Sequence, residues 1–142
     1  MAHIWGLYLP QLTKDGAWDL QLEAARTSDI WYVHSLYTNG YTYKNKLIAD
    51  AMGTDSNRFY IRLGHYLEDG SLLAFHGEHL ELNDAAANPQ TVDSFWVSYL
   101  RKLDHSLTVE FTAGLAHLDN LNYAKGNSDT DYLVKIKIIK PL

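Results

Sequence analysis

The chain has 142 residues, of which 46% are hydrophobic and 20% charged, with a formal net charge of −5 and no cysteine. This length and composition predict a single globular domain over residues 1–142 and argue against intrinsic disorder. The negative charge makes nucleic acid an unfavourable partner, because phosphate binding requires a concentrated positive surface. Without cysteine, disulfides, thiol catalysis and cysteine metal sites are excluded.

The sequence shows no sign of export or of a membrane helix. Residues 1–5 lack the basic start and apolar stretch of a signal peptide. No apolar run approaches the length of a membrane-spanning helix. We therefore expect a soluble, cytoplasmic protein with no membrane span, with secretion by a non-classical route as the alternative.

The first half of the chain predicts four strands. Residues 3–9 form the first, and residues 17–25 alternate between apolar and polar side chains. Residues 29–38 and 41–47 are separated by an Asn-Gly dipeptide, which is typical of a two-residue hairpin turn.

Residues 59–82 predict a hairpin with a defined register. A two-residue turn would pair Leu67 with Leu72, whereas a three-residue loop with Gly70 in the left-handed conformation pairs Leu67 with Ser71. The second register places more apolar side chains on one face, so we expect that one. It gathers four polar side chains on the opposite face: Tyr60, Arg62, His76 and Glu78.

One segment has a helical pattern. From Val92 onward the apolar side chains recur at helical spacing, Pro89 suits a helix entrance and Thr91 can cap it. We expect an α-helix at about 91–103, with a strand over residues 95–100 as the alternative.

Strands at 106–113 and 131–140 complete the pattern, each with its apolar side chains directed inward. About eight antiparallel strands and one α-helix predict a mainly β fold, either an antiparallel β-barrel or a β-sandwich.

The polar face of the 59–82 hairpin is the first candidate site. A carboxylate beside an imidazole and a guanidinium can perform acid–base chemistry or bind an anion. An ordinary solvated sheet face with a cross-strand ion pair between Arg62 and Glu78 is the favoured interpretation.

The histidines are the second candidate. His65 and His79 fall on the apolar side of the hairpin. His76 and His79 would point to opposite faces of a regular strand, so they can share a zinc ion only if a bulge at Gly77 redirects one ring. Buried, hydrogen-bonded histidines are favoured, although in a barrel His34 or His65 would face an internal cavity.

The third candidate is a run of oxygen ligands at alternating positions, Asn127, Asp129 and Asp131, as in calcium loops. Tyr132 and Ile138 occupy the positions where an EF-hand needs Gly and Glu, so an EF-hand is excluded. We predict no cofactor, with calcium at these three residues as the alternative to a simple polar turn.

The fourth candidate is the aromatic content, with ten Tyr, four Trp and four Phe. Several tyrosines lie near Asn and Asp side chains, and rings combined with amides are typical of sugar sites, although Tyr is also common in sheets. The predicted ligand-binding residues lie in the 37–45 hairpin and the 119–131 loop: Tyr37, Asn39, Tyr41, Tyr43, Asn45, Asn120, Asn122 and Tyr123.

These patterns lead to a non-enzymatic, lectin-like module whose partner is a carbohydrate or another small polar ligand. Formation of a homo-oligomer would make its binding multivalent. The alternative is a small-ligand β-barrel or barrel enzyme in which His34, His65 and Glu78 perform acid–base chemistry. A structural subunit of an assembly is the third class.

Overall fold

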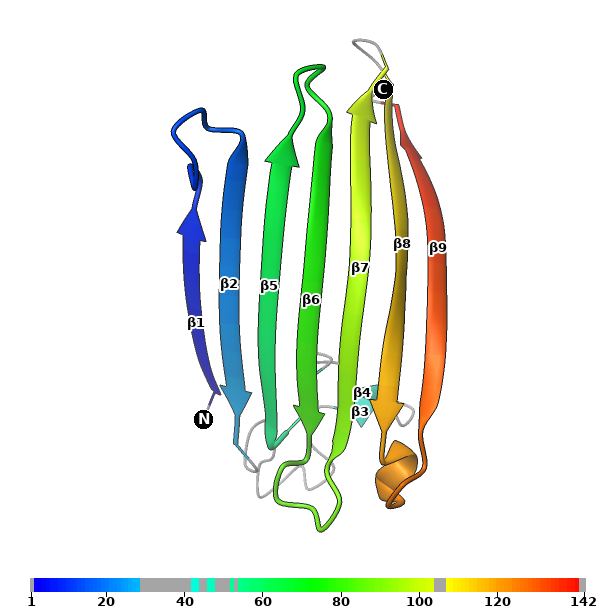
Figure 1. Cartoon of the computed structure of the whole chain (residues 1–142). Helices are drawn as coiled ribbons and strands as arrows, with labels where there is room; N and C mark the ends of the chain where they lie inside the picture. Colours follow the sequence, from blue (N-terminus) through cyan, green and yellow to red (C-terminus); the bar gives the residue numbers. More distant parts are fainter. Residues whose placement is uncertain are drawn as a thin grey trace.

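The computed structural model describes residues 2–28, 42–43, 46–47, 52, 54–103 and 107–140. Most of them form one seven-stranded antiparallel sheet in the order β1-β2-β5-β6-β7-β8-β9 (Figure 1). Its strands are β1 (Ala2–Leu9), β2 (Trp18–Thr27), β5 (Ser56–Tyr66), β6 (Leu72–Leu82), β7 (Gln90–Lys102), β8 (Thr108–Asp119) and β9 (Asp129–Ile139). A separate two-stranded sheet pairs β3 (Thr42–Tyr43) with β4 (Lys46–Leu47), and a 3-10 turn, η1 (Leu121–Tyr123), follows β8.

The predicted mainly β fold is confirmed, but the predicted helix at about 91–103 is wrong. These residues belong to β7, which pairs along its length with β6 and β8. The helical spacing of the apolar residues led to a wrong prediction because β7 carries large apolar side chains on both faces. Trp96 lies on one face, and Phe95 and Val97 lie on the other. The predicted strand at 29–38 lies outside the described residues, and only β3 and β4 are described from the predicted strand at 41–47.

The predicted register of the 59–82 hairpin is confirmed. The Leu67 amide donates to the Ser71 carbonyl over 2.9 Å, and Gly70 adopts a φ of 77°. Pairing runs without a break from Tyr66 opposite Leu72 to Ser56 opposite Leu82, so the bulge considered at Gly77 is absent. His76 and His79 therefore lie on opposite faces of the sheet.

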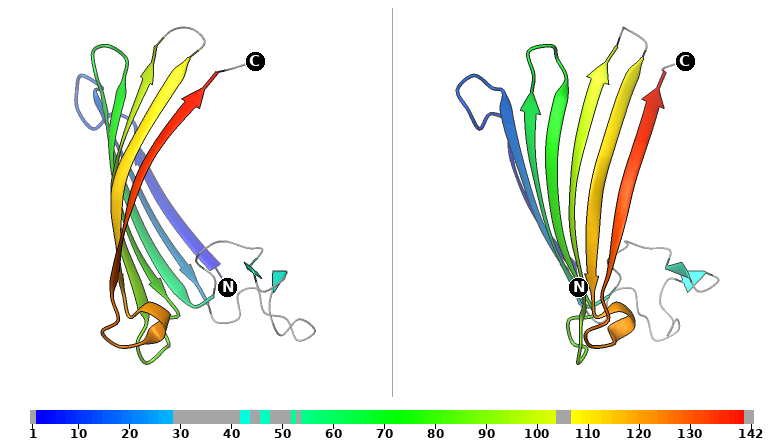
Figure 2. Two further views of the ribbon diagram at one scale, coloured as in Figure 1. Left: turned by 90° about the vertical axis from the view of Figure 1, so that its right-hand side faces the viewer. Right: turned by 45° about the vertical axis from the view of Figure 1, so that its right-hand side comes forward.

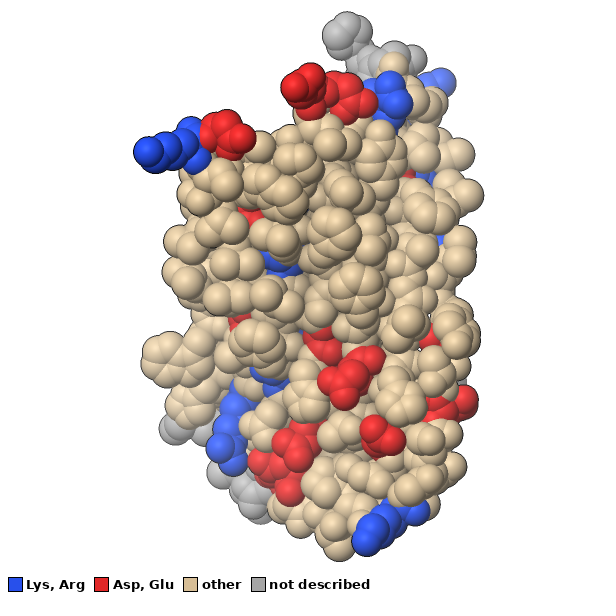
Figure 3. All heavy atoms as spheres, in the orientation of Figure 1, with Lys and Arg blue, Asp and Glu red and all other residues tan. Residues whose placement is uncertain are grey.

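One face of the sheet is apolar and exposed. Figure 3 shows a broad band across it in which few charged atoms are visible, with most charges near the two ends. Phe59 is 48% exposed and Phe95 50% exposed, and in the last strand Tyr132 is 80% exposed. The prediction that the apolar side chains of β8 and β9 point into a core is therefore wrong, because they face the surroundings.

The other face is polar and is the one that the sheet curves around (Figure 2). Asp19 and Thr112 point to this face and are buried, whereas Phe111, next to Thr112 and on the apolar face, is 42% exposed. In a water-soluble sheet with an internal core, large apolar side chains are shielded and polar side chains are exposed. Here short polar side chains are shielded and large apolar ones are exposed, which is the reverse arrangement. Among the described residues, no helix is long and apolar enough to cross a membrane.

Candidate functional site

Three aromatic rings from adjacent strands meet near the middle of the polar face. Tyr60 of β5, His76 of β6 and Trp96 of β7 project to the same side, because the register aligns His76 with Trp96 and places Tyr60 one row away. The His76 and Trp96 rings are stacked, with centroids 4.9 Å apart and an interplanar angle of 7°. The Tyr60 ring lies 6.0 Å from Trp96. We call these three residues the aromatic platform.

Hydrogen bonds hold the central ring of the platform. His76 Nδ1 lies 2.8 Å from the Tyr60 hydroxyl, and His76 Nε2 lies 3.0 Å from Ser98 Oγ. Both ring nitrogens are thus engaged by neighbouring strands, which fixes the orientation of the imidazole. This arrangement makes His76 a supporting member of a surface rather than a free acid or base.

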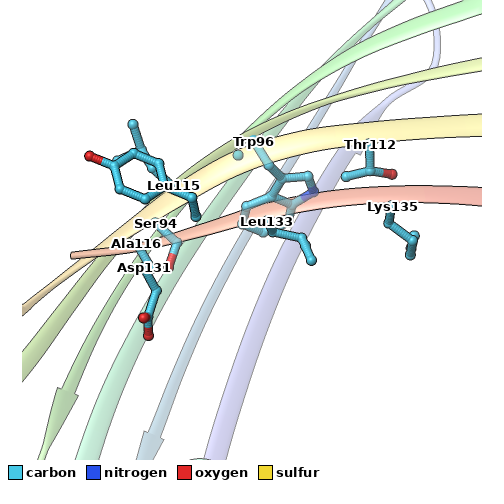
Figure 4. A pocket seen from close by; sticks show the side chains of 10 residues that line it. Ser94, Trp96, Thr112, Leu115, Ala116, Asp131, Leu133 and Lys135 are labelled. Carbon is cyan, nitrogen blue, oxygen red and sulfur yellow. The ribbon is translucent and has the colours of Figure 1, made fainter.

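A groove of about 560 Å³ lies beside the platform, over β7, β8 and β9. Gly114 stands opposite Trp96, and a Cβ at this position would overlap Trp96 Cβ, so the glycine makes room for the indole. Figure 4 shows Trp96 between Asp131 on one side and Lys135 on the other. The groove is lined by Ser94, Trp96, Thr112, Gly114, Ala116, Asp131, Leu133 and Lys135. Leu115 and Tyr132 also line it, although the register places them in a row of the apolar face.

Ion pairs surround the platform on the β2–β6 side. The prediction of an ion pair between Arg62 and Glu78 is wrong. Arg62 forms an ion pair with Asp19 over 2.7 Å, and Glu78 forms one with Arg58 over 2.7 Å. Asp19 also accepts hydrogen bonds from the hydroxyls of Tyr66 and Tyr8. A Cβ at Gly64 would overlap Asp19 Oδ1, so this glycine admits the carboxylate over β5.

The geometry suits binding better than catalysis. An indole face beside a groove with a carboxylate, an ammonium and hydroxyls can hold a flat molecule that has apolar faces and polar edges.

The predicted acid–base set is not brought together. Glu78 lies on the polar face, whereas His65 lies on the apolar face and stacks on Trp18 with ring centroids 4.1 Å apart. The expectation that His65 faces the interior of a barrel is wrong, because the apolar row to which it belongs is the outer one. His34 lies outside the described residues.

Most of the predicted ligand-binding residues cannot be placed. Tyr37, Asn39, Tyr41 and Asn45 lie outside the described residues, and Tyr43 is described only as a position in β3.

The remaining three lie in the connection that follows β8. The Asn120 amide donates to the Pro89 carbonyl over 3.0 Å and its Oδ1 accepts from the Gly126 amide, so this side chain secures the connection itself. Asn122 and Tyr123 are exposed.

The predicted calcium ligands do not form a cluster. Asn127 uses its amide to hold the Leu121 carbonyl, Asp129 accepts from the Thr130 amide and Asp131 lines the groove. Within the described part of the chain, no group of three or more His, Asp or Glu side chains is arranged to hold a metal ion.

Comparison with known proteins identifies the family. The family model of the capsule assembly protein Wzi matches residues 1–133. The chain belongs to this family. No curated protein matches it.

A solved structure with a similar fold is Wzi of Escherichia coli, described as an outer membrane protein involved in group 1 capsule assembly and as a carbohydrate-binding β-barrel. The TM-score is 0.67 at 19% sequence identity, and the match covers 88% of this chain. The chain spans 30% of the length of that protein.

These matches correct two expectations. The prediction of a cytoplasmic protein with no membrane span is wrong: the chain belongs to the Wzi family, and the solved Wzi structure with the matching fold is described as an outer membrane protein. The expectation of an unspecified small polar ligand as the partner is wrong as well, since the family to which the chain belongs is that of a capsule assembly protein. The sequence patterns did not indicate a membrane protein, because the strands of a membrane β-barrel need no long apolar run, only an apolar side chain at every second position.

Trp96 is the site residue that sequence reasoning missed. It was assigned to a helix, where its neighbours would be residues three and four positions away. Its place beside His76 follows from the pairing of β6 with β7, which the register of the 59–82 hairpin does not set.

Proposed function

We propose that this chain forms part of the wall of an outer-membrane β-barrel of capsule assembly, and that its polar face binds carbohydrate. The family and the division of the sheet into an exposed apolar face and a shielded polar face support the first part. In a membrane barrel, apolar side chains face lipid and polar ones face the lumen. The edge strands β1 and β9 are where the wall would continue, because an open edge is not stable within a bilayer.

On β7 the apolar band is slightly shorter than the apolar band of a bacterial outer-membrane barrel. On β7 the outward-facing charges are Asp93 and Arg101, which are eight residue steps apart. At about 3.3 Å per residue they are about 26 Å apart along the strand, or about 20 Å along the membrane normal for a tilt of about 40°. This is close to the apolar band of bacterial barrels, which is about 25 Å tall.

The aromatic platform is the single observation that carries the carbohydrate proposal. Sugar rings expose C–H faces that stack on aromatic rings and hydroxyls that bind carboxylates, amines and amides. The groove presents Trp96 for stacking, with Asp131 and Lys135 placed at its two sides. We propose that a sugar unit lies against Trp96 with its hydroxyls directed to these two side chains.

The loop residues keep a secondary role in this proposal. Asn122 and Tyr123 are exposed in the connection after β8 and are proposed as additional ligand contacts of the lectin-like kind. Asn120 is not, because its amide is already used within the connection.

The test is a glycan array with bacterial capsular oligosaccharides, followed by calorimetry on the best binder. Stacking covers about 60–80 Å² of ring surface, so Trp96→Ala should weaken binding about 10- to 30-fold. Trp5→Ala is the matched control, because this tryptophan lies on the apolar face and is 73% exposed. The affinity of this variant for the glycan should equal that of the wild type. Absence of binding to any glycan, or equal losses in the two variants, would contradict the proposal.

A further inference from the structure

A shallow hollow of about 400 Å³ interrupts the apolar face of the sheet. Its lining includes Gly77, which stands in one row with Ile61, Phe95 and Leu115 across β5 to β8. Ile61 and Phe95 flank Gly77 on the neighbouring strands, and Leu115 lies beyond Phe95. These three side chains are 39%, 50% and 44% exposed, so apolar side chains stand on both sides of a position that has no side chain. We call this feature the Gly77 hollow.

Polar side chains border the Gly77 hollow on one side only. The next row of the same face, two residues along each strand, contains His79, Asp93 and His117. His79 Nδ1 and Asp93 Oδ1 are 2.7 Å apart, and the side chains of the pair are 49% and 60% exposed. The lining of the hollow therefore changes from apolar to polar within about 7 Å, the length of two strand residues.

We propose that the Gly77 hollow binds one phospholipid with an amine headgroup, such as phosphatidylethanolamine. An acyl chain fills the space between Ile61 and Phe95, where it gains van der Waals contact on three sides. The ammonium group donates to the Asp93 carboxylate at the polar border, which is a charge-assisted hydrogen bond. The inference rests on the membrane-facing role proposed above.

Charge at this end of the face favours an amine over a phosphate as the recognised group. Glu81 and Asp119 lie one row beyond Asp93 on the same face, and Arg26 in that row is already paired with Asp84 over 3.4 Å. These carboxylates attract an ammonium group and repel a bare phosphate.

The test uses the purified protein in detergent, stripped of lipid and titrated with phosphatidylethanolamine while native mass spectrometry counts the lipid retained. Gly77→Leu fills the hollow and should weaken retention at least about tenfold. Ala113→Leu adds nearly the same bulk, one carbon less, to the same face outside the hollow, and retention should remain at the wild-type value. Folding of each variant is checked by its thermal transition.

A second comparison tests the headgroup. Asp93→Asn should abolish the preference for phosphatidylethanolamine over phosphatidylcholine, which has no N–H donor, while leaving acyl-chain binding in place. Equal retention by Gly77→Leu and the wild type would overturn the proposal, and so would a preference for lipid A. A protein that does not insert into bilayers refutes the membrane role itself, whereas an inserted protein that retains no lipid refutes only this inference.

Discussion

Replacing Asp19 by Ala should be among the most destabilising single changes on the polar face. Asp19 is fully buried and lies 2.7 Å from Arg62, whose side chain is 15% exposed. The hydroxyls of Tyr66 and Tyr8 donate to the same carboxylate over 3.1 and 3.3 Å. Removing the carboxylate leaves a shielded guanidinium without its counter-charge, which costs about 3–5 kcal/mol.

The measurement is the free energy of unfolding in lipid vesicles, from urea titrations followed by tryptophan fluorescence. Arg101→Ala is the control, because its pair with Asp69 spans 3.7 Å between side chains that are 52% and 44% exposed. Such a pair contributes less than about 1 kcal/mol. The double variant Asp19→Ala/Arg62→Ala should lose less than the sum of its single variants, by about 1–3 kcal/mol. The reasoning is refuted if Asp19→Ala costs no more than Arg101→Ala.

Two further predictions concern the outer face and one exposed turn. Val134→Lys places a charge on the apolar face of β9, which we propose faces lipid, and should cost about 2–4 kcal/mol in vesicle unfolding. Leu133→Lys, directed to the polar face, should cost less than about 1 kcal/mol. Equal costs would contradict the assignment of the two faces. In the β5–β6 turn, the Ser71 amide donates to Asp69 over 3.0 Å and holds the pKa of this carboxyl below its usual value of 3.8. The stability that this bond contributes is therefore present above the usual pKa and is lost as the pH falls through the lowered one. Asp69→Asn should make the free energy of unfolding less dependent on pH between about 4 and 2. If the difference between the free energies of unfolding at pH 6 and pH 2 is the same in the variant and the wild type, the bond contributes nothing.

The local sequence pattern was sufficient to predict the strand pairing where the turn geometry and the alternation of apolar and polar residues require the same register. The 59–82 hairpin was predicted to the residue, because Gly70 permits the left-handed conformation that a three-residue loop needs and any other register would mix the two faces. Two of the three residues of the aromatic platform followed from this, since Tyr60 and His76 were placed together on the polar face.

The same reasoning failed for β7. Apolar side chains at 92, 95, 96, 99 and 100 fit a helical stripe and also fit a strand that contacts partners on both faces. Trp96 points into the polar groove, whereas Phe95 lies on the apolar outer face. A sequence pattern records that a position is apolar and does not record what covers it.

The sequence by itself determined that the chain forms antiparallel strands with alternating faces, and it determined which side chains share a face. Only the tertiary structure decided which of these faces is the inner one. Alternation has the same period whether apolar side chains enter a protein core or face lipid, so the inside is set by the direction in which the whole sheet curves. That curvature shields Asp19 and Thr112, exposes Phe59 and Phe95, and brings Trp96 from β7 against the ring of His76.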